Sequence, residues 1–487
     1  MAVEKKTKNI AVAYKWTTAT NMTTTPLPRS LDTSPQPLPD SHKTPLPHSL
    51  EKMSTDSDDS IESELEAQIE AELEQEIEAE IEAESARSSI RRGGYTRRYI
   101  NRNHEGDHNR LVGKYFSNTP LYTDNKFRRR FRMRKHLFMR IVEALGVWSP
   151  YFRLRRDAFS KVGLSPLQKC TAAIRMMAYG SPADLMDETF RVAESTSMEC
   201  LIHFVTGVRS LFGAQYLRKP TSEDIQRLLQ VADQRGFPGM LGSLDCMHWE
   251  WQNCPVAWKG QFTRGDYKVP TIMLEAVASY DLWIWHAFFG AAGSNNDINV
   301  LDQSPLFTEQ LQGKAPEVQF TVNGSQYNMG YYLADGIYPE WATFVKTILR
   351  PLSAKHKLFA SFQEGERKAV ERAFGVLQKR WAIIRHPARL WEREELANIM
   401  YACIILHNMI IEDERGTYDT PDDNTYEQAQ SSPNLTGLAH GPIYGFTDVL
   451  DKDMKIRDRS SHMRLKEDLI EHIWQKFSTQ QHQAHQE

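Results

Sequence analysis

The chain has 487 residues, of which 40% are hydrophobic and 25% are charged, enough for two or three domains with a sizeable core. The mean hydropathy is −0.54, and no run approaches the ~18 apolar residues of a membrane span. The N-terminus lacks the apolar core of a secretory signal. The five cysteines are too scattered for a disulfide framework or a zinc module. These features argue against the secreted and membrane classes, and we expect a cytosolic or nuclear protein.

The net charge of −4 is the sum of two opposed blocks. Residues Asp56 to Glu84 hold fourteen Asp and Glu and no Lys or Arg. Residues Arg87 to Arg140 hold sixteen Lys and Arg against three acids, a net of +13. Such asymmetry favours a nucleic acid or an acidic surface as the partner of the basic block. The alternatives are a solvated basic face and a nuclear-import signal; both import and DNA binding point to the nucleus.

Residues 1–86 are expected to form a disordered tail. Residues up to about 53 are rich in Thr, Ser and Pro, and they have too few apolar side chains to offset chain entropy. Residues 61–84 repeat a four-residue acidic unit whose aliphatic positions drift around a helix. Two interpretations stay open for this repeat: a solvated acidic helix or tail, and an intramolecular mimic of DNA that shields the basic block.

Residues 87–236 are expected to form a basic arm and a helical DNA-binding region. Residues 91–116 lack periodicity and predict an ordered arm or loop, whereas the spacing from Phe131 to Ile141 predicts a helix. Residues 165–213 predict three helices in quick succession. Their spacing is typical of a helix-turn-helix motif, but a packed helical bundle shows it equally.

The ends of these three helices are predicted from their residue types. Gly180 ends the first helix, Ser181 caps the short second helix, and Ser195 or Thr196 caps the third. In the helix-turn-helix interpretation, the exposed start of the third helix faces the DNA groove. That start contains Ser195, Thr196, Ser197 and Glu199.

Residues 237–413 change in character and predict an α/β domain with a mixed sheet flanked by helices. Three runs rich in β-branched and aromatic residues predict strands at 241–251, 269–281 and 284–293. A helical segment follows, then a buried strand at 330–335 and a long helix at 366–385. Residues 414–487 are expected to be a C-terminal tail that ends in a helix.

Acidic residues stand at the ends of these elements. Asp245 lies within the first strand, Asp297 follows a strand, Asp335 ends the fourth strand, and Glu371 lies at the sheet-facing edge of the long helix. Carboxylates at strand ends and one helix edge can converge at one rim of a sheet, where they would hold two Mg²⁺ ions. Two such ions support phosphodiester cleavage.

Each acid also has an ordinary structural explanation. Asp245 could be an edge residue, Asp335 before Gly336 could form a turn, Asp297 could cap the next helix, and Glu371 could be a surface acid. It is the combination, in this order of strands and helices, that favours catalysis.

The sequence resembles the transposases of the PIF/Harbinger superfamily, and more narrowly their plant Pong-like branch. The resemblance covers residues from about 91 to 413, in order. It rests on RRYINRNHEGDHNRLVGKYF, FRRRFRMRKHLF, MMAYGSPADLMDE, GMLGSLDCMHWEWQNCPVAWKGQF, GSNNDINVLDQSPLF, YYLADGIYPEWATFV, ERKAVERAFGVLQKRWAIIR and ACIILHNMIIEDE. The proline-rich tail and the acidic repeat are not part of it.

The resemblance implies an RNase H-like DDE nuclease domain with Asp245, Asp335 and Glu371 as catalytic acids and Asp297 as a further metal-site acid. It implies two Mg²⁺ or Mn²⁺ ions and cut-and-paste transposition: cleavage at terminal inverted repeats, then attack of the freed 3′ hydroxyl on an A/T-rich target. It also implies a Myb-like partner from the same element. The oligomeric state, including a homo-oligomer, stays open.

Several other residues have two interpretations each. His248 is expected to make a structural hydrogen bond, and His407 to be a satisfied core histidine. The basic residues flanking Glu371 could contact phosphates or form a solvated face; they are Arg367, Lys368, Lys379 and Arg380. The tryptophans near the first acid are expected in the core rather than as stacking platforms; they are Trp249, Trp251 and Trp258.

Two competing classes remain beside the transposase. A domesticated protein could keep the fold as a DNA- or protein-binding module without catalysis, although such a protein tends to lose one of the acids and this sequence keeps all four. A helix-turn-helix transcription regulator would leave residues 240–413 unexplained.

Overall fold

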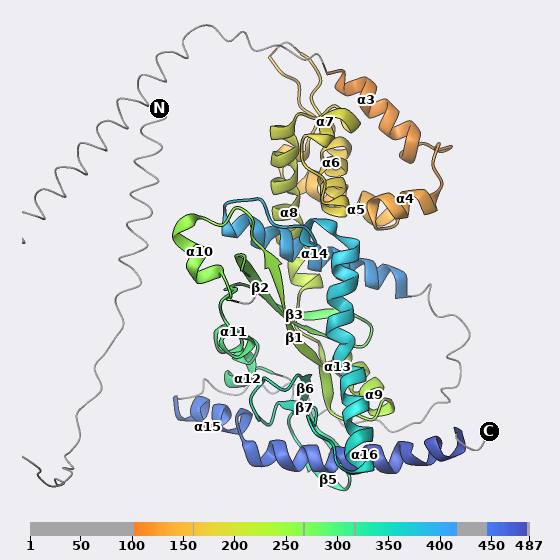
Figure 1. The fold of residues 1–487 in the computed structure, drawn as a ribbon. Helices are drawn as coiled ribbons and strands as arrows, with labels where there is room; N and C mark the ends of the chain where they lie inside the picture. Colours follow the sequence, from red (N-terminus) through yellow and green to blue (C-terminus); the bar gives the residue numbers. More distant parts are fainter. Residues whose placement is uncertain (1–101, 159, 266–267, 316–317, 416–445, 485–487) are drawn as a thin grey trace, which may run out of the picture. The chain divides into compact units, whose positions relative to one another are not determined.

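The computed structural model describes residues 102–158, 160–265, 268–315, 318–415 and 446–484 (Figure 1). The tail and acidic repeat of residues 1–86, the start of the basic block and residues 416–445 lie outside these ranges. What we predicted for those segments therefore stays a prediction. Within the described ranges, no helix is long and apolar enough to cross a membrane.

The first half of the described chain is helical. Its elements are α3 (His104–Leu111), a π-helix (Val112–Phe116), α4 (Asp124–Phe131), α5 (Lys135–Trp148), α6 (Pro166–Tyr179), α7 (Leu185–Phe190), α8 (Glu194–Tyr216) and α9 (Ser222–Gln234). The arm or loop expected at 91–116 is thus wrong from residue 104 onward. The side chain of Asn103 accepts a hydrogen bond from Gly106 N and caps α3, and burial of Leu111 and Tyr115 anchors the segment.

The helix predicted around Phe131 is two helices. Arg132 adopts a left-handed conformation with φ of 65° and ends α4, so Phe131 and Ile141 lie on different helices. The two helices still share one core, because Phe127, Phe131 and Phe138 are buried against one another. Aromatic packing of this kind stabilises a small helical region beyond the area that it buries.

The three helices predicted in residues 165–213 are confirmed as α6, α7 and α8. Gly180 ends α6 in a left-handed conformation, as predicted. The predicted caps of the next two helices are wrong: α7 follows Asp184 rather than Ser181, and α8 begins at Glu194 after Ala193.

The start of α8 differs from the expected exposed surface at one position. Ser195 and Glu199 are exposed and Thr196 is partly buried, whereas the Ser197 side chain is fully buried and its hydroxyl donates to Val192 O. Ser197 therefore anchors the turn between α7 and α8 and cannot contact a DNA groove.

The second half of the chain contains a five-stranded mixed sheet flanked by helices. Its strands are β1 (Met240–Glu250), β2 (Thr271–Ala278), β3 (Ile284–Ala292), β6 (Tyr331–Ala334) and β7 (Phe344–Lys346). The spatial order is β3-β2-β1-β6-β7. Strands β1, β2 and β3 pair antiparallel, and β6 and β7 run parallel to β1. This is an RNase H-like sheet, and the four predicted strands are confirmed.

Three short strands were not predicted from the sequence. β7 extends the sheet beyond β6, and β4 (Phe320–Val322) pairs with β5 (Ser325–Tyr327) in a separate hairpin. Each has three residues, which is too few for the alternation of apolar and polar positions that identifies a strand.

Helices cover both faces of the sheet. They are α10 (Val256–Phe262), α11 (Asp297–Gln303), α12 (Thr308–Leu311), α13 (Ala354–Arg380), α14 (Arg393–Glu414), α15 (Phe446–Ile456) and α16 (Arg459–Ala484). Figure 1 shows α13 running along the sheet and α16 crossing its lower end; α13 packs closely on β1, and α16 packs mainly against α13. Helix α8 packs along α14, so the helical region and the sheet share one hydrophobic core.

The two faces of β1 meet different helices. Ser243 Oγ donates to Glu366 O on α13, whereas Leu244 packs in one cluster with Leu301 of α11. Because side chains alternate along a strand, Asp245 lies on the α13 face and Cys246 on the α11 face. This alternation decides which residues can meet at the candidate site.

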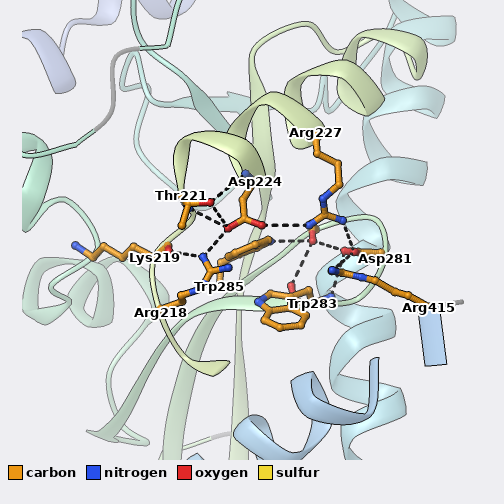
Figure 2. Close-up of polar contacts among 10 residues, drawn as sticks. Arg218, Lys219, Thr221, Asp224, Arg227, Asp281, Trp283, Trp285 and Arg415 are labelled. Carbon is orange, nitrogen blue, oxygen red and sulfur yellow. Dashed lines mark hydrogen bonds and ion pairs between the residues drawn. The ribbon is translucent and has the colours of Figure 1, made fainter. Parts of the chain in front are cut away.

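A cluster of ion pairs fastens the turn between β2 and β3 (Figure 2). Asp281 Oδ2 lies 3.1 Å from Arg227 Nη1 of α9 and 2.8 Å from Arg415 Nη2 at the end of α14. Asp224 joins the cluster through Arg227 and pairs with Arg218. The cluster connects three segments that are far apart in the sequence.

Candidate functional site

Asp245 and Asp335 are brought together by the parallel pairing of β1 and β6. Ser243 is opposite Leu333, and β6 ends at Ala334, so Asp335 leaves the sheet beside the part of β1 that carries Asp245. The Asp335 carboxylate accepts a hydrogen bond from Ile337 N at 2.9 Å. The turn-forming role considered for Asp335 is thus present, and it fixes the carboxylate at the sheet end.

Asp297 approaches from the other side of β1. It is the first residue of α11, whose N-cap is Asn296, so the predicted capping role belongs to its neighbour. The Cys246 thiol hydrogen-bonds the Asp297 carboxylate, and Cys246 Sγ lies 3.6 Å from Tyr338 Oη. Cys246 and Tyr338, which sequence reasoning missed, therefore hold Asp297 close to the strand that carries Asp245.

Glu371 reaches the site through Arg367, which lies one turn earlier on α13. Arg367 Nη1 is 2.7 Å from Glu371 Oε1 and 3.8 Å from Asp245 Oδ2. Arg367 was expected to contact phosphates or to face solvent, yet it is largely buried between two of the predicted catalytic acids. The i,i+4 spacing of Arg367 and Glu371 was the sequence signal for half of this arrangement.

The electrostatics of the site show unrelieved negative charge. The pKa of Asp245 is raised to about 6: burial and the charges of Asp297 and Asp335 raise it, and the Cys246 N–H and Arg367 oppose the rise. Burial and then the Asp335 charge also raise the pKa of Asp297. Carboxylates whose ionised forms are disfavoured by each other are typical of functional sites.

The donor set suits a hard divalent cation, because all four predicted side chains are carboxylates. Within the described ranges, no three Asp, Glu, His or Cys side chains form a group arranged to hold a metal ion. Asp297 and Asp335 lie close enough to raise the pKa of Asp245, whereas Arg367 lies between Asp245 and Glu371.

Both predictions for histidine are confirmed. His248 Nδ1 is 2.8 Å from Thr271 Oγ1, a structural hydrogen bond between β1 and β2. His407 is fully buried; Arg380 Nη1 contacts its Nδ1, and Leu282 O contacts its Nε2, both at 2.9 Å. Burial, followed by the Arg380 charge, lowers the pKa of His407 to about 3. The imidazole is therefore neutral.

The remaining residues for which two interpretations were given differ in which interpretation the structure supports. Lys368 and Lys379 are exposed, whereas Arg380 turns inward to His407 and is no solvated residue. Trp249 and Trp251 are core residues, as expected. Trp258 is 40% exposed, which departs from the expectation of a core residue.

Comparisons with known proteins agree with this arrangement. Residues 214–418 match the family model of the plant transposon protein family, and residues 108–146 match a domain of unknown function. The chain is 24% identical over 284 residues to the protein ALP1-like of Arabidopsis thaliana, an alignment that covers 55% of this chain and 67% of that protein. No solved structure matches the chain.

An RNase H-like sheet with acids at its strand ends and a family match across it defines a transposase-related protein. The match of residues 214–418 to the plant transposon family and the likeness to the ALP1-like protein support the Harbinger-related superfamily that the motifs resemble.

Proposed function

We propose that this protein is a DNA transposase that cleaves and joins strands at the ends of a Harbinger-type element. One observation carries the proposal: Asp297 and Asp335 lie close enough to raise the pKa of Asp245, and Arg367 of α13 links Asp245 to Glu371. Asp245 has one distant arginine contact, at 3.8 Å, whereas the structural acid Asp281 has two closer ones.

In this proposal, Asp245, Asp335 and Glu371 hold two Mg²⁺ or Mn²⁺ ions, with Asp297 as a further ligand. Bound divalent ions would activate water and stabilise the leaving 3′ oxygen of the cleaved strand. The chain supplies the positions of the carboxylates: β1 fixes Asp245, the turn at Ile337 fixes Asp335, and the Cys246 thiol orients Asp297. Preorganised ligands of this kind limit the reorganisation needed during the reaction.

DNA is the proposed substrate, in the form of terminal inverted repeats and an A/T-rich target. Support comes from exposed basic side chains on the helical region, which could neutralise phosphates. Among the described residues they include Lys126, Arg129, Arg153, Arg155 and Arg156. We further propose nuclear location, which rests on the basic block of residues 87–140, and a Myb-like partner, which rests on the superfamily.

An excision assay tests the activity. A plasmid carrying the element ends is incubated with the protein and Mg²⁺ or Mn²⁺, with and without a Myb-like partner. Asp335→Asn is expected to abolish cleavage while DNA binding survives, because the amide keeps an oxygen for the Ile337 N–H but loses the charge. Asp302→Asn, a matched change at an exposed acid of α11, should leave cleavage intact. Cleavage that persists in Asp335→Asn would refute the assignment.

A non-catalytic DNA- or protein-binding module is the second candidate. The position of Arg367 between Asp245 and Glu371 favours it, because an internal cation there replaces some of the charge that metal ions would supply. This candidate predicts that wild type binds DNA and that neither Mg²⁺ nor Mn²⁺ produces cleavage under any combination of partner and substrate.

A further inference from the structure

Arg367 makes an unusual contact for a residue beside a nuclease site. One nitrogen, Nη1, lies 2.7 Å from Glu371 Oε1 and 3.8 Å from Asp245 Oδ2, and the side chain is 17% exposed. The guanidinium therefore lies against carboxylates from both a strand and a helix. Arg stays protonated at every pH at which the protein is folded, so this positive charge is permanent.

The same carboxylate oxygens are those through which the acids would bind a divalent ion. A guanidinium in contact with a carboxylate repels a second cation at the same carboxylate, even though each carboxylate keeps a second oxygen. A divalent ion therefore binds Asp245 and Glu371 more weakly while Arg367 contacts them, and metal binding favours displacement of Arg367 from at least one of them.

The displaced guanidinium would have a suitable new partner. It is a planar fork of donors that matches the oxygens of a phosphate, and α13 places it at the site where a DNA strand would be cleaved. Electrostatics thus link two events at Arg367: its guanidinium loses the carboxylates as partners and gains a DNA phosphate.

We infer that Arg367 is a built-in cation that competes with divalent metal for Asp245 and Glu371 and passes to a DNA phosphate when metal binds. This rests on the proposed function, which it deepens by adding regulation. Metal would bind weakly to the free protein and more tightly once DNA is present. Thermodynamic linkage requires that metal then strengthens DNA binding by the same factor.

The first measurement is the binding of Mn²⁺ alone, followed by the electron paramagnetic resonance signal of the free ion. Arg367→Gln removes the charge and should tighten Mn²⁺ binding about tenfold or more. Lys368→Gln removes the same charge from the next, exposed residue and should change the affinity by less than about threefold. This control separates the contact with the acids from the general field of the helix.

A second variant protects the test against misfolding, which circular dichroism monitors. Arg367→Lys keeps a positive charge for the acids, but a single ammonium cannot match the guanidinium fork. It should bind Mn²⁺ more tightly than wild type and less tightly than Arg367→Gln. If Arg367→Gln does not fold, Arg367→Lys alone decides, and an affinity equal to or below that of wild type overturns the inference.

The DNA arm tests the transfer to phosphate. A duplex carrying the element end should raise the Mn²⁺ affinity of wild type and raise that of Arg367→Gln much less. An equal rise in both proteins overturns the transfer.

Failure of the inference and failure of the proposed function give different results. Mn²⁺ binding to wild type that needs Asp245 but is not tightened in either Arg367 variant overturns the competition and leaves the metal site intact. No Mn²⁺ binding to wild type or to either variant overturns both.

Discussion

Two groups of buried acids in this protein have opposite surroundings. Asp281 lies in the turn between β2 and β3 with an arginine on each side, Arg227 and Arg415 (Figure 2). Burial alone would raise its pKa, but the hydrogen bond from Ser279 and the two arginines lower it below the usual range. Asp281 is an acid whose charge the fold stabilises.

Asp245 is buried to a similar degree and has the opposite balance. Its pKa rises to about 6 because burial and the charges of Asp297 and Asp335 outweigh the Cys246 N–H and Arg367. Asp245 is thus an acid whose charge the fold tolerates at a cost in stability. The difference shows that burial alone does not identify a functional acid; the sign of the neighbouring charges does.

The largest expected effect comes from removing the Asp281 carboxylate, which pairs with Arg227 and Arg415. Asp281→Ala would leave Arg227 and Arg415 facing each other with no carboxylate between them. Removing one partner of a fully buried ion pair costs about 3–5 kcal/mol, but Arg227 and Arg415 are 32% and 39% exposed. The free energy of unfolding, measured by urea denaturation at pH 7, should therefore fall by about 2–3 kcal/mol. Asp302→Ala, at an exposed acid of α11, should change it by less than about 0.5 kcal/mol. A loss below about 1 kcal/mol for Asp281→Ala would contradict the assigned role.

Removing the charge of Asp245, whose pKa is raised, should have the opposite effect on stability from removing that of Asp281. A carboxyl whose pKa is raised in the folded state favours folding at low pH, and that contribution is lost as the pH rises through about 6. At pH 7 asparagine, an uncharged side chain of the same shape, restores that contribution to stability. In the presence of a chelator, Asp245→Asn should therefore raise the free energy of unfolding by about 1–3 kcal/mol while it abolishes cleavage.

The control for this prediction is added metal. Mn²⁺ should stabilise wild type and leave Asp245→Asn unchanged, because a ligand that binds the folded state alone stabilises it. A variant less stable than wild type in chelator would show that the Asp245 charge contributes to the fold.

The contrast between the two groups was only partly visible in the sequence. The positions of the four acids at strand and helix ends followed from periodicity and from recognised motifs, and the structure places Asp297 and Asp335 near Asp245. The contact between Arg367 and Asp245 could not be predicted, because it depends on how α13 docks on β1. The arginines around Asp281 come from α9 and α14, and no local pattern links them to the turn.

Helix α13 shows how a local signal can mislead. Its predicted start at residue 366 follows Gly365, which is a poor helix former by about 1 kcal/mol relative to alanine, but the helix begins at Ala354. Leu358 and Phe359, which precede the glycine, are buried in a cluster with residues of α16. Tertiary packing of an apolar face therefore outweighs one unfavourable residue, and its docking partner lies more than 90 residues away in the sequence.

Acid should weaken the compensated region first. His407, which contacts the turn after Asp281 through Leu282 O, has a pKa near 3 against an ordinary value of 6.5. Through His407 the unfolded chain binds one more proton than the folded chain between these values, so His407 lowers stability as the pH falls, whereas Asp245 acts in the opposite direction below about pH 6. The lowered pKa of Asp281 has the same sign as that of His407 and acts below its ordinary value of 3.8.

This effect is measured as the slope of the free energy of unfolding against pH. One proton corresponds to about 1.4 kcal/mol per pH unit, measurable from urea denaturation between pH 6 and pH 4. His407→Gln should reduce the slope by about one proton whatever its stability at pH 7. An unchanged slope would mean that His407 is not the group that titrates.

The smallest expected effect tests whether exposure, rather than geometry alone, separates an effective ion pair from a weak one. Arg459 Nε lies 2.7 Å from Glu340 Oε2, a shorter distance than either arginine contact of Asp281, but the Arg459 side chain is 77% exposed. Water and salt screen such a pair.

A double-mutant cycle with Arg459→Ala and Glu340→Ala should give a coupling energy of about 0.5 kcal/mol or less. The same cycle at Arg227 and Asp281 should give a coupling energy above about 1 kcal/mol, within the range found for residues in contact. Similar coupling energies at the two sites would mean that burial does not strengthen the Asp281 pairs, and the contrast with Asp245 would then lose its physical basis.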